Sequence, residues 1–68
     1  MEIPAQAVGK TVAEVNFRAR FDLNIIAIEN GGKLVEVVRP DYAFCTGDIL
    51  FLSGSKDGLL RLNAWAEN

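Results

Sequence analysis

Apolar residues recur along the chain with two different periods, which predict a helix near each end and three strands between them. Residues 12–20 and the segment that starts at Lys56 or Asp57 space their apolar positions as one face of a helix does, with stripes of Val12, Val15 and Ala19 and of Leu59, Leu62 and Ala66. Residues 24–28, 33–38 and 49–53 are short apolar runs bounded by turn residues, and the unbroken run at 24–28 predicts a strand buried on both faces. This order predicts a compact α+β domain, preceded at residues 1–6 by an extended lead-in or a short edge strand.

Local signals indicate where these elements begin and end. Thr11 and Glu14 have the spacing of a capping box that starts the first helix, and Glu14 lies four positions before Arg18, where an ion pair would support the helix. Ser55 has the hydroxyl group that caps the second helix. The sequence Asn30-Gly31-Gly32 predicts a tight turn after the first strand, because glycine adopts positive φ without steric cost.

Size and composition narrow the class of protein. The chain has 68 residues, half of them hydrophobic, which suits one globular domain over residues 1–68. Its core is marginal, because burial at roughly 25 cal/mol per Å² nearly balances chain entropy of roughly 1.5 kcal/mol per residue, so oligomerisation is expected. A single cysteine fits a reducing, cytoplasmic compartment, and no apolar run approaches the roughly 20 residues of a membrane span.

The composition also argues against several kinds of chemistry. The seven lysines and arginines are scattered and the net charge is −2, so no nucleic-acid partner is expected. The chain has no histidine, and Cys45 has no base beside it in the sequence. Asp41 and Asp48 lie in turn sequences, where aspartate caps backbone N–H groups. With neither clustered metal ligands nor a Gly-rich phosphate loop, we expect no enzyme activity, no metal site and no cofactor.

One pair of polar residues interrupts the apolar surface at the join between the first helix and the first strand. Arg18 ends the helix and Asn24 begins the strand, so both could line one concave surface with Val12 and Ile25. An apolar surface with a few converging polar groups is the usual form of a small-ligand site. The structural alternative is that Arg18 pairs with Glu14 and that Asn24 caps the turn before it. From the residues alone, both interpretations stay open.

The ordered set of motifs resembles the TrkA-C domain, also known as the C-terminal domain of RCK (regulator of potassium conductance) proteins. The resemblance covers residues 3–62 and rests on the order and spacing of the matching segments rather than on any single one. These segments are Gly9-Lys10-Thr11, Val15, Phe17-Arg18, Phe21, Asn24-Ile25-Ile26-Ala27-Ile28, Gly32-Lys33, Pro40-Asp41, Gly47-Asp48-Ile49-Leu50 and Gly54-Ser55.

The resemblance implies a dimeric regulatory domain on the cytoplasmic face of the membrane. In several family members a small effector binds at the dimer interface, and in some Gram-positive potassium systems this effector is cyclic di-AMP. By motif position, an arginine would contact the phosphates, an asparagine and an isoleucine the base, and apolar residues would close the pocket. The corresponding residues are Val12, Arg18, Asn24, Ile25, Val38 and Pro40. A negative charge at Glu29 would oppose an anionic ligand if its side chain faced this pocket.

The resemblance also implies particular partners. They are a second copy of the chain, a small anionic effector such as cyclic di-AMP, and a potassium channel or transporter or a related cation transport system. The membrane component could be a separate subunit or part of the same chain. The alternative within the family is a ligand-free dimerisation module of a cation/proton antiporter or another transporter.

Overall fold

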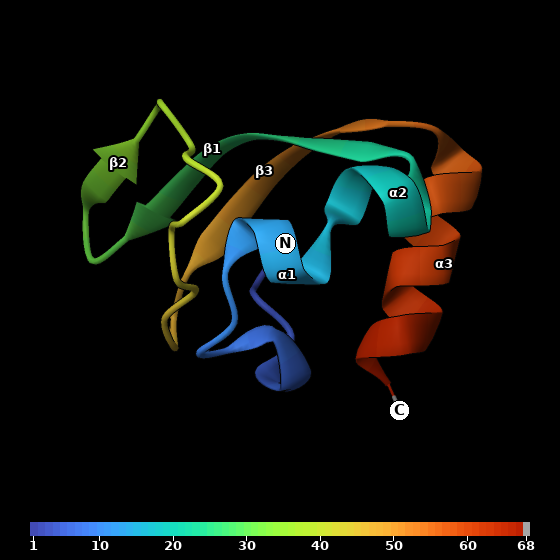
Figure 1. Cartoon of the computed structure of the whole chain (residues 1–68), viewed down its shortest axis with the longest axis horizontal. Coiled ribbons are helices and arrows are strands. Elements are labelled where there is room, and N and C mark those ends of the chain that lie inside the picture. The colour runs from blue at the N-terminus through green and yellow to red at the C-terminus, as the bar shows by residue number, and fades with distance from the viewer. Residues whose placement is uncertain (68) are drawn as a thin grey trace.

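A three-stranded antiparallel sheet carries all the helical segments on one of its faces (Figure 1). The structure is a computed structural model that describes residues 1–67. Its elements are the 3-10 helix η1 (Ala5–Ala7), the helices α1 (Val12–Val15), α2 (Phe17–Phe21) and α3 (Lys56–Ala66), and the strands β1 (Leu23–Asn30), β2 (Lys33–Val35) and β3 (Ile49–Gly54). The predicted α+β class is therefore confirmed, and no helix among residues 1–67 is long and apolar enough to cross a membrane.

The strand order is β2-β1-β3, and a two-residue turn sets the register of the first pair. Gly31 and Gly32 have φ angles of 60° and 82°, so Asn30 pairs with Lys33, as the turn sequence predicted. The second strand was predicted to run over residues 33–38, which is too long. β2 pairs with β1 over three residues, and Val37 beyond it is 78% exposed.

The prediction that the first strand is buried on both faces is wrong, because the helices cover only one face. A register shift between Ile25 and Ala27 interrupts the pairing of β1 with β3 and marks a bulge. Ile26, at the bulge, is 56% exposed. Together with Leu34 and Phe51, which are 51% and 46% exposed, it leaves apolar side chains on the solvent side of the sheet.

The prediction of one helix over residues 12–20 is also wrong, because the helix breaks at Asn16. The capping box of Thr11 and Glu14 is present and starts α1, but Asn16 adopts the left-handed conformation with φ of 54°. Without the break, Phe17 would point about 200° away from Val15 around the helix axis. The break allows both side chains to be buried, at 3% and 2% exposure.

Aromatic residues and a close helix contact join the two ends of the chain in one core. The rings of Phe17 and Phe44 lie 5.9 Å apart, and Trp65 on α3 lies 5.6 Å from Phe21 on α2. Helix α3 begins after Ser55, as predicted, and approaches α2 so closely that a Cβ atom on Gly58 would lie 2.0 Å from the carbonyl oxygen of Phe21. The N-terminal lead-in is extended apart from η1 and forms one isolated bridge to β3.

Candidate functional site

The two polar residues predicted at the helix–strand join contact each other directly. The side chain of Asn16 accepts a hydrogen bond of 3.3 Å from the Ala19 N–H, which fixes the start of α2. Arg18 extends from α2 towards β1, and its Nη1 donates a hydrogen bond to Oδ1 of Asn24. Both residues are exposed. Because a guanidinium group has five N–H donors, this contact orients Arg18 and leaves donors for a ligand.

The structural alternative for this pair is wrong in both parts. Glu14 does not pair with Arg18, because its Oε1 accepts the Thr11 N–H at 2.8 Å within the capping box. Hydrogen bonds from the backbone and side chain of Thr11 lower the pKa of Glu14. Asn24 uses its amide oxygen for Arg18 and not for the preceding turn.

The apolar residues of the predicted site lie on α1, on β1 and on the loop of residues 36–48, which connects β2 to β3. The loop is tied to α1 by two backbone hydrogen bonds of 2.9 Å, from the Val12 N–H to the Tyr42 carbonyl and from the Ala13 N–H to the Pro40 carbonyl. Three of the predicted residues are half-buried against the core, namely Val12, Ile25 and Val38. Pro40 is exposed. Within the predicted site, Arg18 is thus hydrogen-bonded to Asn24, and the backbone of Val12 is hydrogen-bonded to the loop that contains Pro40.

Glu29 and the residue after it belong to the hairpin. The Glu29 carboxylate accepts a hydrogen bond of 3.0 Å from the Gly32 N–H, across the turn between β1 and β2. The Asn30 side chain donates to Asp48 at 2.7 Å and to the Thr46 carbonyl at 3.2 Å. The negative charge at Glu29 is therefore oriented by the turn.

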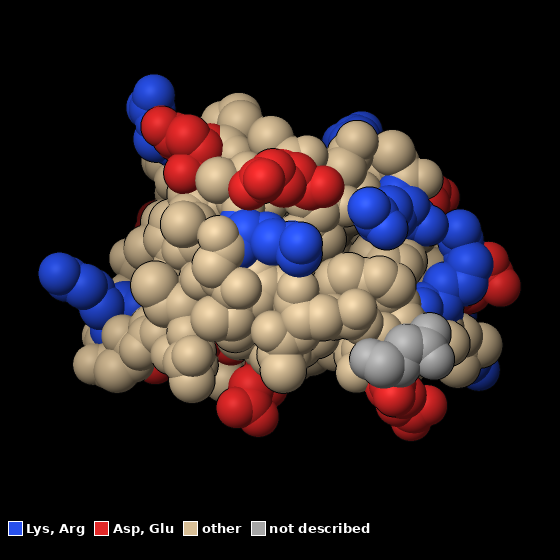
Figure 2. All heavy atoms as spheres, turned by 60° about the horizontal axis from the view of Figure 1, so that its bottom comes forward, with Lys and Arg blue, Asp and Glu red and all other residues tan. Residues whose placement is uncertain are grey.

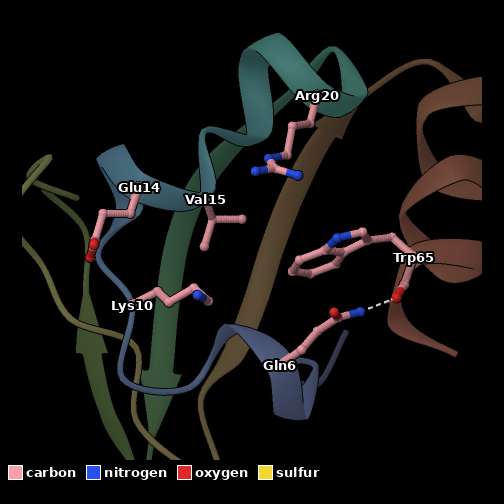
Figure 3. A pocket seen from close by; sticks show the side chains of 6 residues that line it. All are labelled: Gln6, Lys10, Glu14, Val15, Arg20 and Trp65. Carbon is pink, nitrogen blue, oxygen red and sulfur yellow. Dashed lines mark hydrogen bonds between the residues drawn. The ribbon is translucent and has the colours of Figure 1, made fainter. Parts of the chain in front are cut away.

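A pocket of about 460 Å³ opens elsewhere, between η1, α1, α2 and α3 (Figure 3). Its lining contains none of the six residues predicted from the motifs. The lining residues are Gln6, Lys10, Glu14, Val15, Arg20 and Trp65. Figure 3 shows that the Lys10, Arg20 and Trp65 side chains point into one space in front of Val15.

Comparison with models of known protein families identifies the family of this chain. Residues 2–66 match the family model described as the TrkA-C domain. The chain belongs to the TrkA-C domain family. The resemblance inferred from the motifs is confirmed, and the family is one of regulatory domains rather than of enzymes.

Known relatives contain this TrkA-C domain within longer proteins. Over 51 residues the domain is 31% identical to the uncharacterized transporter YfbS of Escherichia coli (strain K12). The match covers 75% of this chain and 8% of that transporter, so the chain spans a small part of its curated relative.

Solved structures of two other proteins resemble the domain closely. The RCK C domain of the potassium transport protein KtrA, in complex with cyclic diadenosine monophosphate, gives a TM-score of 0.88 at 26% identity, with 94% of this chain and 75% of that chain covered. The RCK_C domain dimer of S. agalactiae BusR, in complex with the same nucleotide, gives a TM-score of 0.83 at 26% identity, with 97% and 82% covered.

BusR also bears on the expectation that this domain has no nucleic-acid partner. A further structure shows BusR in complex with its busAB-promotor DNA, and the domain covers 32% of that chain at 26% identity and a TM-score of 0.83. On the face of this domain shown in Figure 2, basic and acidic side chains are interspersed with wide uncharged areas. The absence of a nucleic-acid partner stays a prediction.

A buried carboxylate holds the loop of the candidate site against the sheet of the TrkA-C domain. Asp48 has no exposed surface, and its Oδ2 accepts hydrogen bonds of 2.9 Å from the Tyr42 hydroxyl and from the Cys45 N–H, while its Oδ1 accepts from Asn30. Burial favours a raised pKa for Asp48, but the hydrogen bonds from Cys45, Asn30 and Tyr42 outweigh it and lower the pKa. Burial and Asp48 together raise the pKa of Tyr42 to about 12.

Sequence reasoning missed the 460 Å³ pocket because its residues come from several separate segments. Gln6 lies within η1, Lys10 follows η1, Arg20 belongs to α2, and Trp65 belongs to α3. No motif joins them, and only their convergence in space could have been a signal. For metal chemistry, residues 1–67 contain no group of three histidine, cysteine, aspartate or glutamate side chains placed to hold an ion.

Proposed function

We propose that this TrkA-C domain regulates a potassium channel or transporter, or a related cation transport system, from the cytoplasmic face of the membrane. In this proposal, two copies of the domain bind a small anionic effector between them, with cyclic di-AMP as the first candidate. The observation that carries the proposal is the exposed Arg18 guanidinium, which is oriented by its hydrogen bond to Asn24. The KtrA and BusR domains, which share the fold, have structures with this nucleotide bound.

The symmetry of the nucleotide matches the symmetry of a homodimer. Cyclic di-AMP has two phosphates and two adenine bases related by a two-fold axis, so an isologous dimer would offer it the same residues twice. Arg18 of each copy would bind a phosphate through its planar fork of N–H donors. The Asn24 amide has both a donor and an acceptor for the base. Val12, Ile25 and the loop of Val38 and Pro40 would enclose the apolar faces of the bases.

The regulatory consequence depends on a difference in affinity between two dimer geometries. A ligand that touches both copies stabilises the geometry in which both Arg18 side chains reach it. It shifts the equilibrium only by the ratio of its affinities for the two geometries. A transport component attached to each copy would then respond to the effector through their relative position.

The second candidate function is a dimerisation module of a cation/proton antiporter or another transporter, with no effector. The exposed apolar side chains Ile26, Leu34 and Phe51 on the solvent face of the sheet favour it. A domain of this size gains stability when a partner covers such a surface. The match to part of a transporter sequence is compatible with this function.

Calorimetric titration with cyclic di-AMP separates the two functions. We expect saturable binding to the unmodified chain and at least a roughly tenfold loss of affinity in Arg18→Gln, because a charge-assisted contact to each phosphate is removed. Lys56→Gln removes the same charge from an exposed position at the start of α3 and should bind normally. Light scattering measures the dimer in parallel.

Three outcomes are informative. Binding that Arg18→Gln does not weaken would contradict the proposed site. A dimer without any heat from cyclic di-AMP or other nucleotides would favour the ligand-free module. A chain that stays monomeric with and without nucleotide would count against both functions.

A further inference from the structure

The 460 Å³ pocket lies on a different side of α2 from the Arg18–Asn24 pair. Successive residues of a helix differ in direction by about 100°, so Arg18 and Arg20 point about 200° apart. Arg18 reaches Asn24 on β1, whereas Arg20 lines the pocket between η1, α1 and α3 (Figure 3). The volume falls within the range of small-molecule sites, roughly 300–1,000 Å³. The two surfaces can therefore be tested separately.

Two positive charges in this pocket lack partners among residues 1–67. Neither the Arg20 guanidinium nor the Lys10 ammonium group takes part in a hydrogen bond or ion pair of the described residues. The one acid in the lining, Glu14, is held by Thr11, and Figure 3 shows its carboxylate pointing away from the space between Lys10 and Trp65. Lys10 acts on Glu14 through its charge, which contributes to the lowered pKa of that carboxyl group. The pocket thus presents a net positive charge to any small molecule that enters it.

The remaining walls are held in place by the rest of the fold. The Gln6 side chain donates a hydrogen bond to the carbonyl oxygen of Trp65, which fixes η1 to the end of α3. The Trp65 ring packs against Phe21 and extends into the pocket, and Val15 forms an apolar floor. Arg61 donates to the Arg20 carbonyl at 3.0 Å, so the backbone of Arg20 is anchored while its side chain faces the pocket.

We propose that this pocket binds a small organic anion in which a phosphate or carboxylate group is joined to a planar ring. The anionic group would bind between Lys10 and Arg20, and the ring would lie against the indole of Trp65. Arginine and lysine are the usual partners of such groups, and aromatic stacking tolerates many ring types. This second ligand site is independent of the proposed cyclic di-AMP site and shares no residue with it.

The single tryptophan of the chain reports directly on this pocket. We would titrate the unmodified chain with adenosine 5′-monophosphate and follow Trp65 fluorescence, with adenosine and inorganic phosphate as half-ligands. We expect a saturable change with the monophosphate and binding at least about fivefold weaker for each half-ligand. Lys10→Gln and Arg20→Gln should each weaken binding about fivefold, as for one charged contact at a partly exposed site.

Matched variants make the result decisive. Lys56→Gln removes an equal charge at an exposed position outside the pocket, so it should bind the monophosphate with unchanged affinity. Circular dichroism would verify that each variant is folded, and Arg20→Lys would restore part of the affinity. No saturable change at millimolar monophosphate would overturn the proposal. So would equal binding by Arg20→Gln and the unmodified chain, or adenosine binding as tightly as its monophosphate.

Discussion

Replacing Asp48 with asparagine tests whether a buried charge holds the sheet and the loop of the candidate site together. The substitution keeps the shape of the side chain, so it creates no cavity. It removes the negative charge and exchanges one of two acceptor oxygens for an NH₂ donor. The three hydrogen bonds that the carboxylate accepts, from Asn30, Tyr42 and Cys45, cannot then all be kept.

The expected cost follows from these three bonds. A hydrogen bond to a charged group contributes about 1.5–3 kcal/mol and a neutral one about 0.5–1.5 kcal/mol, so the two bonds to Oδ2 lose about 1 kcal/mol each. On the other side the new NH₂ group faces the Asn30 donor, which adds about 1–2 kcal/mol. We therefore expect Asp48→Asn to lower the free energy of unfolding by about 3–4 kcal/mol, close to the whole stability of about 3–5 kcal/mol that a core of this size supplies.

Urea unfolding followed by circular dichroism measures this loss, with Asp41→Asn as the control. The Asp41 side chain is 82% exposed and lies 3.6 Å from Arg39, so its loss should cost less than about 0.5 kcal/mol. A variant too unstable in buffer can be compared in an osmolyte that favours the folded state. If Asp48→Asn is no less stable than Asp41→Asn, the carboxylate does not hold the loop and the reasoning is refuted.

The stabilities of the unmodified chain and of Asp48→Asn should also depend differently on pH in the acidic range. Because the pKa of Asp48 is lowered in the folded state, its contribution to stability is present above the unfolded pKa of about 3.9 and is lost as the pH falls through the folded pKa. The stability difference between the unmodified chain and Asp48→Asn should therefore narrow in that acidic range. A stability difference that stays constant down to the lowest pH at which both chains fold would contradict the lowered pKa of Asp48.

Three further predictions concern the alkaline range, a close helix contact and the helix break. Folding raises the pKa of Tyr42 from about 10 to about 12, so the free energy of unfolding should fall as the pH rises between these values. Tyr42→Phe has no hydroxyl group to ionise, so its urea midpoint should fall less than that of the unmodified chain over the same pH range. Gly58→Ala should cost more than about 3 kcal/mol or prevent folding, because its Cβ would overlap the Phe21 carbonyl oxygen, while Asn63→Ala on the same helix should be nearly neutral in thermal unfolding. Asn16→Ala should lower the free energy of unfolding by about 1–2 kcal/mol, as measured by chemical denaturation. Asn16→Gly should lower it less, since glycine tolerates φ of 54°. Equal losses of stability in the two variants would contradict this explanation.

Features set by neighbouring residues could be predicted from the sequence. The capping box of Thr11 and Glu14, the two-glycine turn after Asn30 and the cap at Ser55 all depend on residues within three positions of one another. Because these signals are local in the sequence, the start of both helices and the hairpin were expected correctly.

Features that depend on distant segments could not be predicted in the same way. The apolar run of β1 gives no sign that only one face of the sheet is covered, so the exposure of Ile26 was missed. Helical spacing alone favours a continuous helix through Asn16, and only the burial of Phe17 together with Val15 requires the break. The 460 Å³ pocket needs Lys10, Arg20 and Trp65 side by side, which no short-range pattern specifies.

The break at Asn16 also affects the charges available to a ligand. In a continuous helix, Glu14 would lie one turn before Arg18 and could neutralise its guanidinium. In the observed fold, Glu14 is held by Thr11, and Arg18 turns to the neutral amide of Asn24. The side chains of Arg18 and Arg20 therefore extend from different sides of the five-residue helix α2, whose backbone is anchored at Arg20. Glu14 neutralises neither of these two charges. The same left-handed residue that allows Phe17 to enter the core thus leaves α2 able to present one cation to each of the two proposed sites.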